Sequence, residues 1–159
     1  KDDIEFMLST NPGEDLKPLG SAASGGELSR IMLAIKAVLA EHDSISTLIF
    51  DEIDVGISGR TAQKVAEKMA FIGKSHQVIC ISHLAQIAAM ADCHYLIEKN
   101  NTDNHTSTVI RRLSDDESVD ELARILGGAR ITEAVRESAG EMKQLAGKEK
   151  EESIKRLTA

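Results

Sequence analysis

The chain has 159 residues, of which 26 are acidic and 19 are basic, so its net charge is −7. This length suits about one domain, which buries roughly two-thirds of the surface that the unfolded chain exposes. No apolar run approaches the roughly 20 residues of a membrane-spanning helix, so an integral membrane protein is not expected. Negative charge repels nucleic acid, and three phenylalanines with one tyrosine make no base-stacking platform, so a stand-alone DNA-binding module is not expected either.

The two cysteines, Cys80 and Cys93, have neither the spacing of a zinc site nor the pattern of a disulfide framework. Cys80 lies inside the apolar run 78–81, so we expect a small buried thiol and a reducing, cytosolic compartment. The sequence starts at Lys1 without a basic and apolar leader, which is typical of a processed product or of a piece of a longer chain.

The N-terminal part is predicted to contain a strand, a loop and a helix. Alternating apolar residues predict a strand over 4–8, and the break at Asn11-Pro12-Gly13 begins a loop that runs to Ser21. Apolar residues three and four positions apart then predict one face of a helix over 28–39. The members of that face are Leu28, Ile31, Met32, Ile35, Val38 and Leu39.

A parallel strand–helix–strand unit is predicted next. The apolar runs 47–50 and 77–82 are typical of buried strands, and the amphipathic helix between them ends at Gly73. Such a crossover is right-handed in nearly all proteins, so the two strands would lie side by side and end at the same edge of the sheet. The buried face of the helix is predicted to consist of Ala62, Val65, Met69 and Ile72.

A short helix over 84–91 and a hairpin are predicted to follow. The hairpin strands are expected over 94–97 and 107–110, at the edge of the sheet, and the polar loop 100–105 joins them.

The C-terminal part is predicted to be helical. Ser118 and Glu121 have the spacing of a capping box, which would open a helix that ends at Gly127 and Gly128. A further helix is expected over 132–157, with a heavily charged end that frays or docks elsewhere.

Ser24-Gly25-Gly26-Glu27 stands at the start of the first long helix. Glycines let a ligand approach the backbone closely, and the N–H groups and dipole of a helix start favour an anion such as phosphate. Ser24 and Glu27 also have the spacing of an ordinary capping box. On the sequence, phosphate binding and helix capping both stay open.

Asp51 and Glu52 directly follow the predicted strand 47–50. The carboxyl ends of parallel strands are where open α/β sheets bind ligands. One carboxylate could hold Mg²⁺ there, and its neighbour could polarise a water molecule. The alternative is that the strand ends at the surface and both acids are simply solvated.

His83 follows the strand 77–82, so the crossover could bring it beside these acids as a hydrogen-bonding partner of a phosphate. A lone histidine at such a place is more often a polar strand end. Asp54 more readily makes a turn than a ligand pair with Asp51.

Taken together, the order of these features resembles the C-terminal half of an ABC-type ATPase. The Ser24–Glu27 segment resembles the signature motif, the strand ending in Asp51 and Glu52 resembles the Walker B strand, and His83 resembles the switch histidine. Longer strings are similar to the bacterial RecN family of SMC-like recombination proteins, nearly end to end. Those strings are Asn11-Pro12-Gly13-Glu14, Ser24 to Arg30, Phe50 to Gly59 and Ile81-Ser82-His83-Leu84.

The resemblance implies an α/β fold, namely the C-terminal lobe of a P-loop NTPase-like ABC ATPase head with a parallel sheet core, flanking helices and an edge hairpin. Residues 1–23 would form a leading strand and loop, 24–99 the motif-bearing core, and 100–159 the hairpin and C-terminal helices. It further implies ATP and Mg²⁺ as cofactors, an ATP-dependent homodimer of heads, and a cytoplasmic, nucleoid-associated protein. Its role would be DNA double-strand break repair and recombination, with DNA bound through the full-length protein.

By the same resemblance, Asp51 would help to hold Mg²⁺, Glu52 would position the attacking water and His83 would contact the γ-phosphate. The signature residues of one copy would reach the ATP of the opposite head, so they could not serve the Asp51–Glu52 site of their own copy. These signature residues are Ser24, Gly25, Gly26 and Glu27.

Two features depart from the wider family. Ser58 stands where the D-loop usually ends in Asp, and it is the candidate to replace that contact. The pattern G-x-x-x-x-G-K-[ST] and the Q-loop glutamine do not occur, and in SMC-like chains they lie in an N-terminal lobe beyond a long coiled coil. The chain alone is therefore predicted not to hydrolyse ATP, and its expected partners include its own N-terminal lobe and coiled coil.

Other interpretations stay open. An ATPase subunit of another ABC family, of the SMC, Rad50-like or transporter type, would share these motifs. A magnesium-dependent nuclease or topoisomerase-type domain would use Asp51, Glu52 and Asp54, although such sites typically contain a D-x-D pair that this segment lacks. A non-catalytic interaction module would have an inert helix cap and solvated acids.

Overall fold

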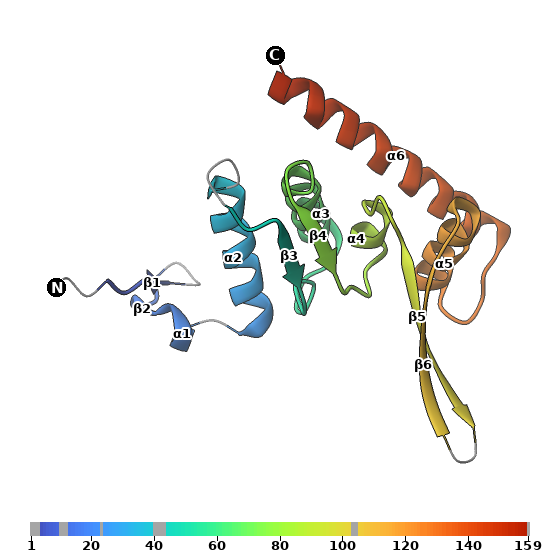
Figure 1. Ribbon diagram of the computed structural model, residues 1–159, viewed down its shortest axis with the longest axis horizontal. Coiled ribbons are helices and arrows are strands. Elements are labelled where there is room, and N and C mark those ends of the chain that lie inside the picture. The colour runs from blue at the N-terminus through green and yellow to red at the C-terminus, as the bar shows by residue number, and fades with distance from the viewer. Residues whose placement is uncertain (1–3, 10–12, 23, 40–43, 103–104, 159) are drawn as a thin grey trace. The chain divides into compact units, whose positions relative to one another are not determined.

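The computed structural model describes residues 4–9, 13–22, 24–39, 44–102 and 105–158 (Figure 1). The predicted break at Asn11 and Pro12 lies outside these ranges. The chain forms two compact units, Lys1–Ser82 and His83–Ala159, and each is described by itself. Among the described residues, no helix is both long enough and apolar enough to cross a bilayer.

The first unit contains most of the motifs. Its elements are β1 (Met7–Leu8), β2 (Lys17–Pro18), α1 (Leu19–Ala22), α2 (Gly25–Leu39), β3 (Thr47–Phe50), α3 (Gly59–Ile72) and β4 (Gln77–Cys80). Those of the second unit are α4 (Ala85–Ala89), β5 (Tyr95–Thr102), β6 (His105–Arg112), α5 (Asp115–Gly127) and α6 (Glu133–Thr158). The division into segments 1–23, 24–99 and 100–159 stays a prediction.

The predicted parallel crossover is confirmed. β3 and β4 pair in parallel, with Thr47 opposite Gln77 and Phe50 opposite Cys80. Helix α3 connects them and ends before Gly73, whose N–H donates to the carbonyl oxygen of Met69. Its buried residues are Ala62, Val65, Ala66, Met69 and Ile72, which include all four predicted ones.

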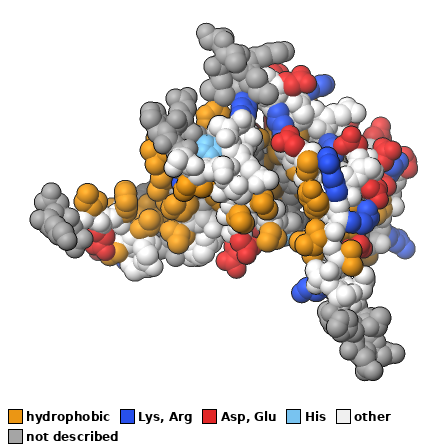
Figure 2. All heavy atoms as spheres, viewed as in Figure 1, with side chains coloured by type: hydrophobic (Ala, Val, Ile, Leu, Met, Phe, Trp, Pro, Cys, Tyr) orange, Lys and Arg blue, Asp and Glu red, His pale blue; other side chains and the backbone are white. Residues whose placement is uncertain are grey.

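The opposite face of this strand pair is open. The apolar face predicted for α2 is also largely exposed, although Ile31 and Ile35 are half-buried. The side chain of Ile49 in β3 is 68% exposed and that of Val38 in α2 is 81% exposed, whereas Leu48 and Phe50 face the core. Figure 2 shows hydrophobic side chains at the surface of this unit. The prediction of strands buried on both faces is therefore wrong for one face. Periodicity identifies the apolar side of an element but not what covers it.

The N-terminal segment also differs from the prediction. The strand expected over 4–8 is reduced to β1, which pairs in antiparallel fashion with β2, inside the segment predicted as a loop. Ile4 and Phe6 lie before β1 and are exposed, so they do not form the predicted strand face. The short helix α1 was not predicted either.

The hairpin of the second unit is confirmed and is longer than predicted. β5 and β6 pair in antiparallel fashion from Tyr95 opposite Arg112 to Thr102 opposite His105. Polar residues fill the outer half of both strands, so their period-two pattern is weak although the backbone ladder continues. Within the described residues, these strands pair only with each other, and their predicted place at the edge of the parallel sheet stays a prediction.

The capping box of α5 is one turn earlier than predicted. The Ser114 hydroxyl accepts from the N–H of Glu117 at 3.3 Å, and the Glu117 carboxylate accepts from the N–H of Ser114 at 2.8 Å. Both Ser114/Glu117 and Ser118/Glu121 have the required spacing. The earlier pair places three acidic residues in the first turn, where the helix dipole favours them. Ser118 is instead buried inside α5, and its hydroxyl contacts Nδ1 of His94 at 2.9 Å.

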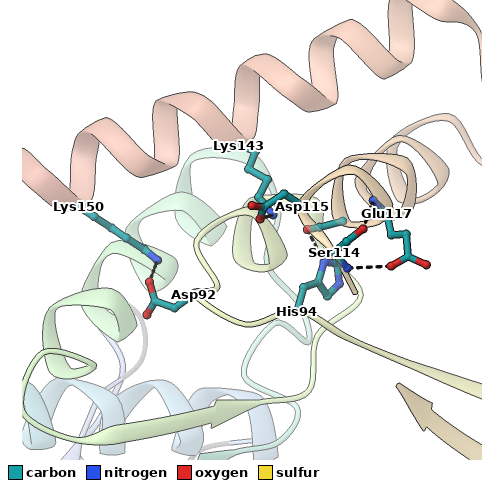
Figure 3. A network of polar contacts seen from close by, with 8 residues as sticks. Asp92, His94, Ser114, Asp115, Glu117, Lys143 and Lys150 are labelled. Atoms are coloured by element: carbon teal, nitrogen blue, oxygen red, sulfur yellow. Dashed lines mark hydrogen bonds and ion pairs between the residues drawn. The ribbon is translucent and has the colours of Figure 1, made fainter. Parts of the chain in front are cut away.

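Helix α6 packs along α5, and both of its ends lie one residue later than those of the predicted helix over 132–157 (Figure 3). Ala139 and Ala146 are buried. Lys143 pairs with Asp115 of α5 at 3.5 Å, and Lys150 pairs with Asp92, next to β5. The charged helix is therefore docked within its own unit up to Lys150.

Candidate active site

The predicted acids lie in a tight turn that follows β3, residues 51–56 (the 51–56 turn). Asp51 and Glu52 are both exposed. The Asp51 Oδ1 atom accepts a hydrogen bond from the N–H of Glu52 at 2.9 Å, and the Glu52 carbonyl accepts from the N–H of Val55 at 3.1 Å. Glu52 has a φ of 57°, and no other non-glycine residue in the described chain has a positive φ. Such left-handed backbone persists only where its surroundings hold it.

The signature-like segment caps α2. The Ser24 N–H and hydroxyl donate to Oε2 of Glu27 at 2.8 and 2.9 Å, and the Glu27 N–H donates back to the Ser24 hydroxyl. The backbone and then the side-chain bond from Ser24 lower the pKa of Glu27 below its ordinary value. The helix starts at Gly25, earlier than the predicted Leu28. Helix capping, one of the two interpretations of this segment, is thus a structural fact.

The two signature glycines touch the 51–56 turn. A methyl group at Gly25 would lie 2.7 Å from Oε2 of Glu52. At Gly26, which is buried, it would lie 2.9 Å from the carbonyl oxygen of Glu52 and 3.0 Å from that of Val55. The structure therefore brings the predicted motif 24–27 and the predicted acids together within one chain. The role of the signature residues in an opposite head stays a prediction.

The sequence analysis missed Ser29 and Arg30 as site residues. The Ser29 hydroxyl donates to the carbonyl oxygen of Asp51 at 3.1 Å. The Arg30 Nη1 atom donates to the carbonyl oxygens of Ile53 at 3.1 Å and of Val55 at 2.9 Å. Their helical spacing from Gly26, three and four positions on, puts them on the side of α2 that faces the turn, and this spacing is the signal that could have identified them.

Asp54 joins the turn to the end of β4. Its side chain is only 3% exposed, and its Oδ2 atom accepts a hydrogen bond from the hydroxyl of Ser82 at 2.7 Å. Burial, followed by the charges of Asp54 and Asp51, raises the pKa of the nearby Cys80 thiol to about 12. Cys80 is half-buried rather than fully buried.

The remaining predicted residues lie at element boundaries. Ser58 is the N-cap of α3 and is exposed, and its side chain makes no capping hydrogen bond to that helix. His83 is exposed and is the first residue of the second unit. Its predicted approach to the carboxylates stays a prediction.

The donor set of the turn fits a magnesium site that is shared with a phosphate ligand. The described residues contain no group of three or more His, Cys, Asp or Glu side chains that could hold a metal ion. Mg²⁺ usually takes one or two carboxylates and completes its shell with phosphate oxygens and water, so Asp51 alone is a sufficient protein ligand. A nuclease-type site on Asp51, Glu52 and Asp54 is not supported, because the Asp54 carboxylate is buried against Ser82.

Comparison with known proteins identifies the family. No protein-family model matches the chain. A protein of Halalkalibacterium halodurans named DNA repair protein RecN is 52% identical over 145 residues, which cover 91% of this chain. Proteins of the same name from Bacillus subtilis and Treponema pallidum are 46% and 51% identical over 139 and 127 residues. The chain is a RecN-family sequence.

The chain spans about a quarter of the length of these RecN relatives, 26%, 24% and 22% respectively. One solved structure is similar to 76% of this chain and to 79% of its own chain. Its description reads "Structural biochemistry of ATP-driven dimerization and DNA stimulated activation of SMC ATPases". It has 23% identity and a TM-score of 0.47, a score that is too low to define a shared fold. The similarity to RecN proteins, by contrast, favours the RecN family over the other ABC-type families that share the short motifs.

Proposed function

We propose that this chain is the C-terminal lobe of an ATPase head in an SMC-like DNA repair protein of the RecN family. The full-length protein would bind and hydrolyse ATP between two heads and act in double-strand break repair and recombination. The observation that carries the proposal is the packing of Gly25 and Gly26 against the turn that bears Asp51 and Glu52. The names of the RecN relatives support the assignment to DNA repair.

The carboxylates would have separate roles in hydrolysis. Asp51 would hold Mg²⁺, which, when bound, neutralises charge on the phosphate groups. Glu52 is exposed and can accept a proton from a water molecule, so it would orient that water for attack. His83 would donate a hydrogen bond to the terminal phosphate.

The start of α2 would contact the ATP of the opposite head. The Ser24 hydroxyl now donates to Glu27, but the Ser24 N–H donates to the same carboxylate oxygen. The hydroxyl can therefore turn toward a phosphate while the backbone bond keeps the helix capped. Gly25 has no side chain, so a ligand that displaces the flexible Glu52 carboxylate beside it could approach the backbone of the helix start. Ser58 would complete the contact between the heads.

The open apolar surface of the first unit supports a missing partner lobe. Ile49 of β3 and Ile79 of β4 are exposed on neighbouring strands, and Ile81 continues this surface. Within the described residues, β3 and β4 have no further strand on either outer edge. We infer that the N-terminal lobe of the same protein supplies these strands, the Walker A loop and the Q-loop glutamine. The isolated chain, which lacks the Walker A pattern, would then not hydrolyse ATP.

Light scattering on the complete head, with both lobes joined, tests this proposal. With Glu52→Gln to block hydrolysis, Mg-ATP should double the mass of this head. Ser24→Arg should abolish the doubling, because a long cation would fill the helix start. Ser114→Arg is the matched control, because it makes the same change in the other capping box, and it should leave the doubling intact. An unchanged mass with ATP would refute the composite site and favour an interaction module.

A further inference from the structure

The 51–56 turn is attached to α2 on both sides of Glu52. The Ser29 hydroxyl holds the carbonyl group that precedes Glu52, that of Asp51. Arg30 holds carbonyl groups that follow it, through one nitrogen, Nη1, that donates at 3.1 and 2.9 Å. A guanidinium donates in fixed directions, so these two bonds define both the distance and the orientation of the turn relative to the helix.

The conformation of Glu52 depends on these attachments. Its left-handed φ of 57° is unfavourable for an L-residue with a long side chain, and neither Asp51 nor Ile53 is a glycine that could share the bend. Gly26 lets the helix approach so closely that the Glu52 carbonyl would contact any larger residue. The direction of the Glu52 carboxylate is thus tied to the position of the first two turns of α2.

We propose that Arg30 is a positioning residue for Glu52, which couples the signature helix to the direction of the catalytic carboxylate. This inference rests on the proposed function, in which Glu52 orients the attacking water. Arg30 acts through the carbonyl groups of Ile53 and Val55, to which its Nη1 atom donates. A movement of α2 when its start engages a ligand is thereby passed to the residue that performs the chemistry.

Lysine at position 30 separates this role from simple stabilisation. Its side chain is one atom shorter than that of arginine, and its ammonium group lacks the fixed donor directions of a guanidinium, so it can donate to these carbonyl oxygens without fixing the orientation of the turn. The kcat of ATP hydrolysis should therefore be highest in the wild type, lower in Arg30→Lys and lowest in Arg30→Ala. A purely structural arginine would instead lose stability, with kcat unchanged in the molecules that stay folded.

The test uses the full-length protein with Arg30→Lys, Arg30→Ala and Ser29→Ala. Arg130→Ala is the matched control, since Arg130 is an exposed arginine between α5 and α6. A catalytic group displaced by about 1 Å can lower the rate on the order of 100-fold, so Arg30→Ala should reduce kcat by about 10- to 100-fold. The KM for ATP should stay within about twofold, because ground-state binding is not touched. Arg130→Ala should change neither constant.

Hydrogen exchange without nucleotide gives a second, catalysis-independent measurement. Arg30→Ala should speed exchange at residues 51–56 and leave α3 as protected as in the wild type. Wild-type kcat together with wild-type exchange in Arg30→Ala would overturn the proposal, and so would loss of protection throughout α2, β3 and α3. If Glu52→Gln hydrolyses ATP like the wild type, the proposed function itself fails. Faster exchange at residues 51–56 in Arg30→Ala would then show only that Arg30 holds the turn. In that case Arg30 positions no catalytic group, and this proposal is overturned as well.

Discussion

Replacing Gly26 by alanine should destabilise the first unit, because α2 and the 51–56 turn touch at this position. The new methyl group would lie 2.9 and 3.0 Å from the carbonyl oxygens of Glu52 and Val55, and 3.1 Å from Nη1 of Arg30. The carbonyl oxygens belong to the backbone, so the helix must move away from the turn. Overpacking of this kind typically costs about 1–3 kcal/mol, and alanine regains up to about 1 kcal/mol through helix propensity. The net loss should be about 1 kcal/mol.

Gly25 and Gly147 offer matched alanine controls. At Gly25 the close atom is Oε2 of Glu52, the far end of a flexible side chain that can rotate away, so stability should change little. At Gly147 in α6, no described atom lies within 4 Å of the new methyl group. Alanine there should stabilise the helix by up to about 1 kcal/mol, because it restricts the unfolded chain and fits the helical backbone.

Hydrogen exchange read by mass spectrometry reports the two units separately. Gly26→Ala should speed exchange in α2 and β3 by about fivefold, the factor that corresponds to about 1 kcal/mol, and leave α5 unchanged. Gly147→Ala should slow exchange in α6. If hydrogen exchange in α2 of Gly26→Ala is as slow as in the wild type, the described close approach of α2 and the 51–56 turn is wrong.

Three further predictions concern individual side chains. Cys93 is exposed and the pKa of Cys80 is raised to about 12, so iodoacetamide at pH 8 should alkylate Cys93 first. A fast phase that survives Cys93→Ser would contradict this. Burial lowers the pKa of His94 below its ordinary 6.5, so the unfolded chain takes up the proton first, and the second unit should lose stability as the pH falls through 6.5. Urea unfolding between pH 8 and 5 measures this loss, which His94→Gln should reduce. Ser114→Ala should cost about 1 kcal/mol and speed exchange in the first turn of α5. Ser118→Ala should leave that turn protected. If Ser118→Ala speeds exchange there and Ser114→Ala does not, Ser118 is the capping residue and the assignment of Ser114 is wrong.

The parallel unit was predictable because its signals are local. The apolar run 47–50 is continuous and ends in charged residues, and the residues of α3 repeat with helical spacing up to Gly73. These patterns depend on neighbours within one or two turns. The capping box of α5 shows the limit of this approach, because two consecutive Ser-x-x-Glu segments have the same spacing. The structure places the cap at Ser114 and buries Ser118 against His94.

The contacts that build the candidate site were predictable only in part. Residue type and spacing predicted where the motifs lie in the sequence. They did not predict that residues 24–27 contact the 51–56 turn within one unit. Arg30 and Ser29 donate to carbonyl groups at least 22 residues away in the sequence. Helical spacing places both on one side of α2 with Gly26, but it does not show which carbonyl groups that side approaches. The exposure of Ile49 could not be predicted for a similar reason. The sequence of β3 shows that its residues are apolar but not which other element packs on them.

The composite site is tested most directly by mixing two variants of the full-length protein that can pair but hydrolyse ATP poorly. Ser24→Ala removes the hydroxyl without filling the helix start and retains Glu52, whereas Glu52→Gln retains Ser24. A mixed dimer therefore has one intact site if the two residues serve the same ATP from opposite heads. Random pairing should then restore about a quarter of the wild-type ATPase activity, since half of the dimers are mixed and each has one working site. If the mixture is no more active than the two variants alone, Ser24 and Glu52 act within one chain and the account of two cooperating heads is wrong.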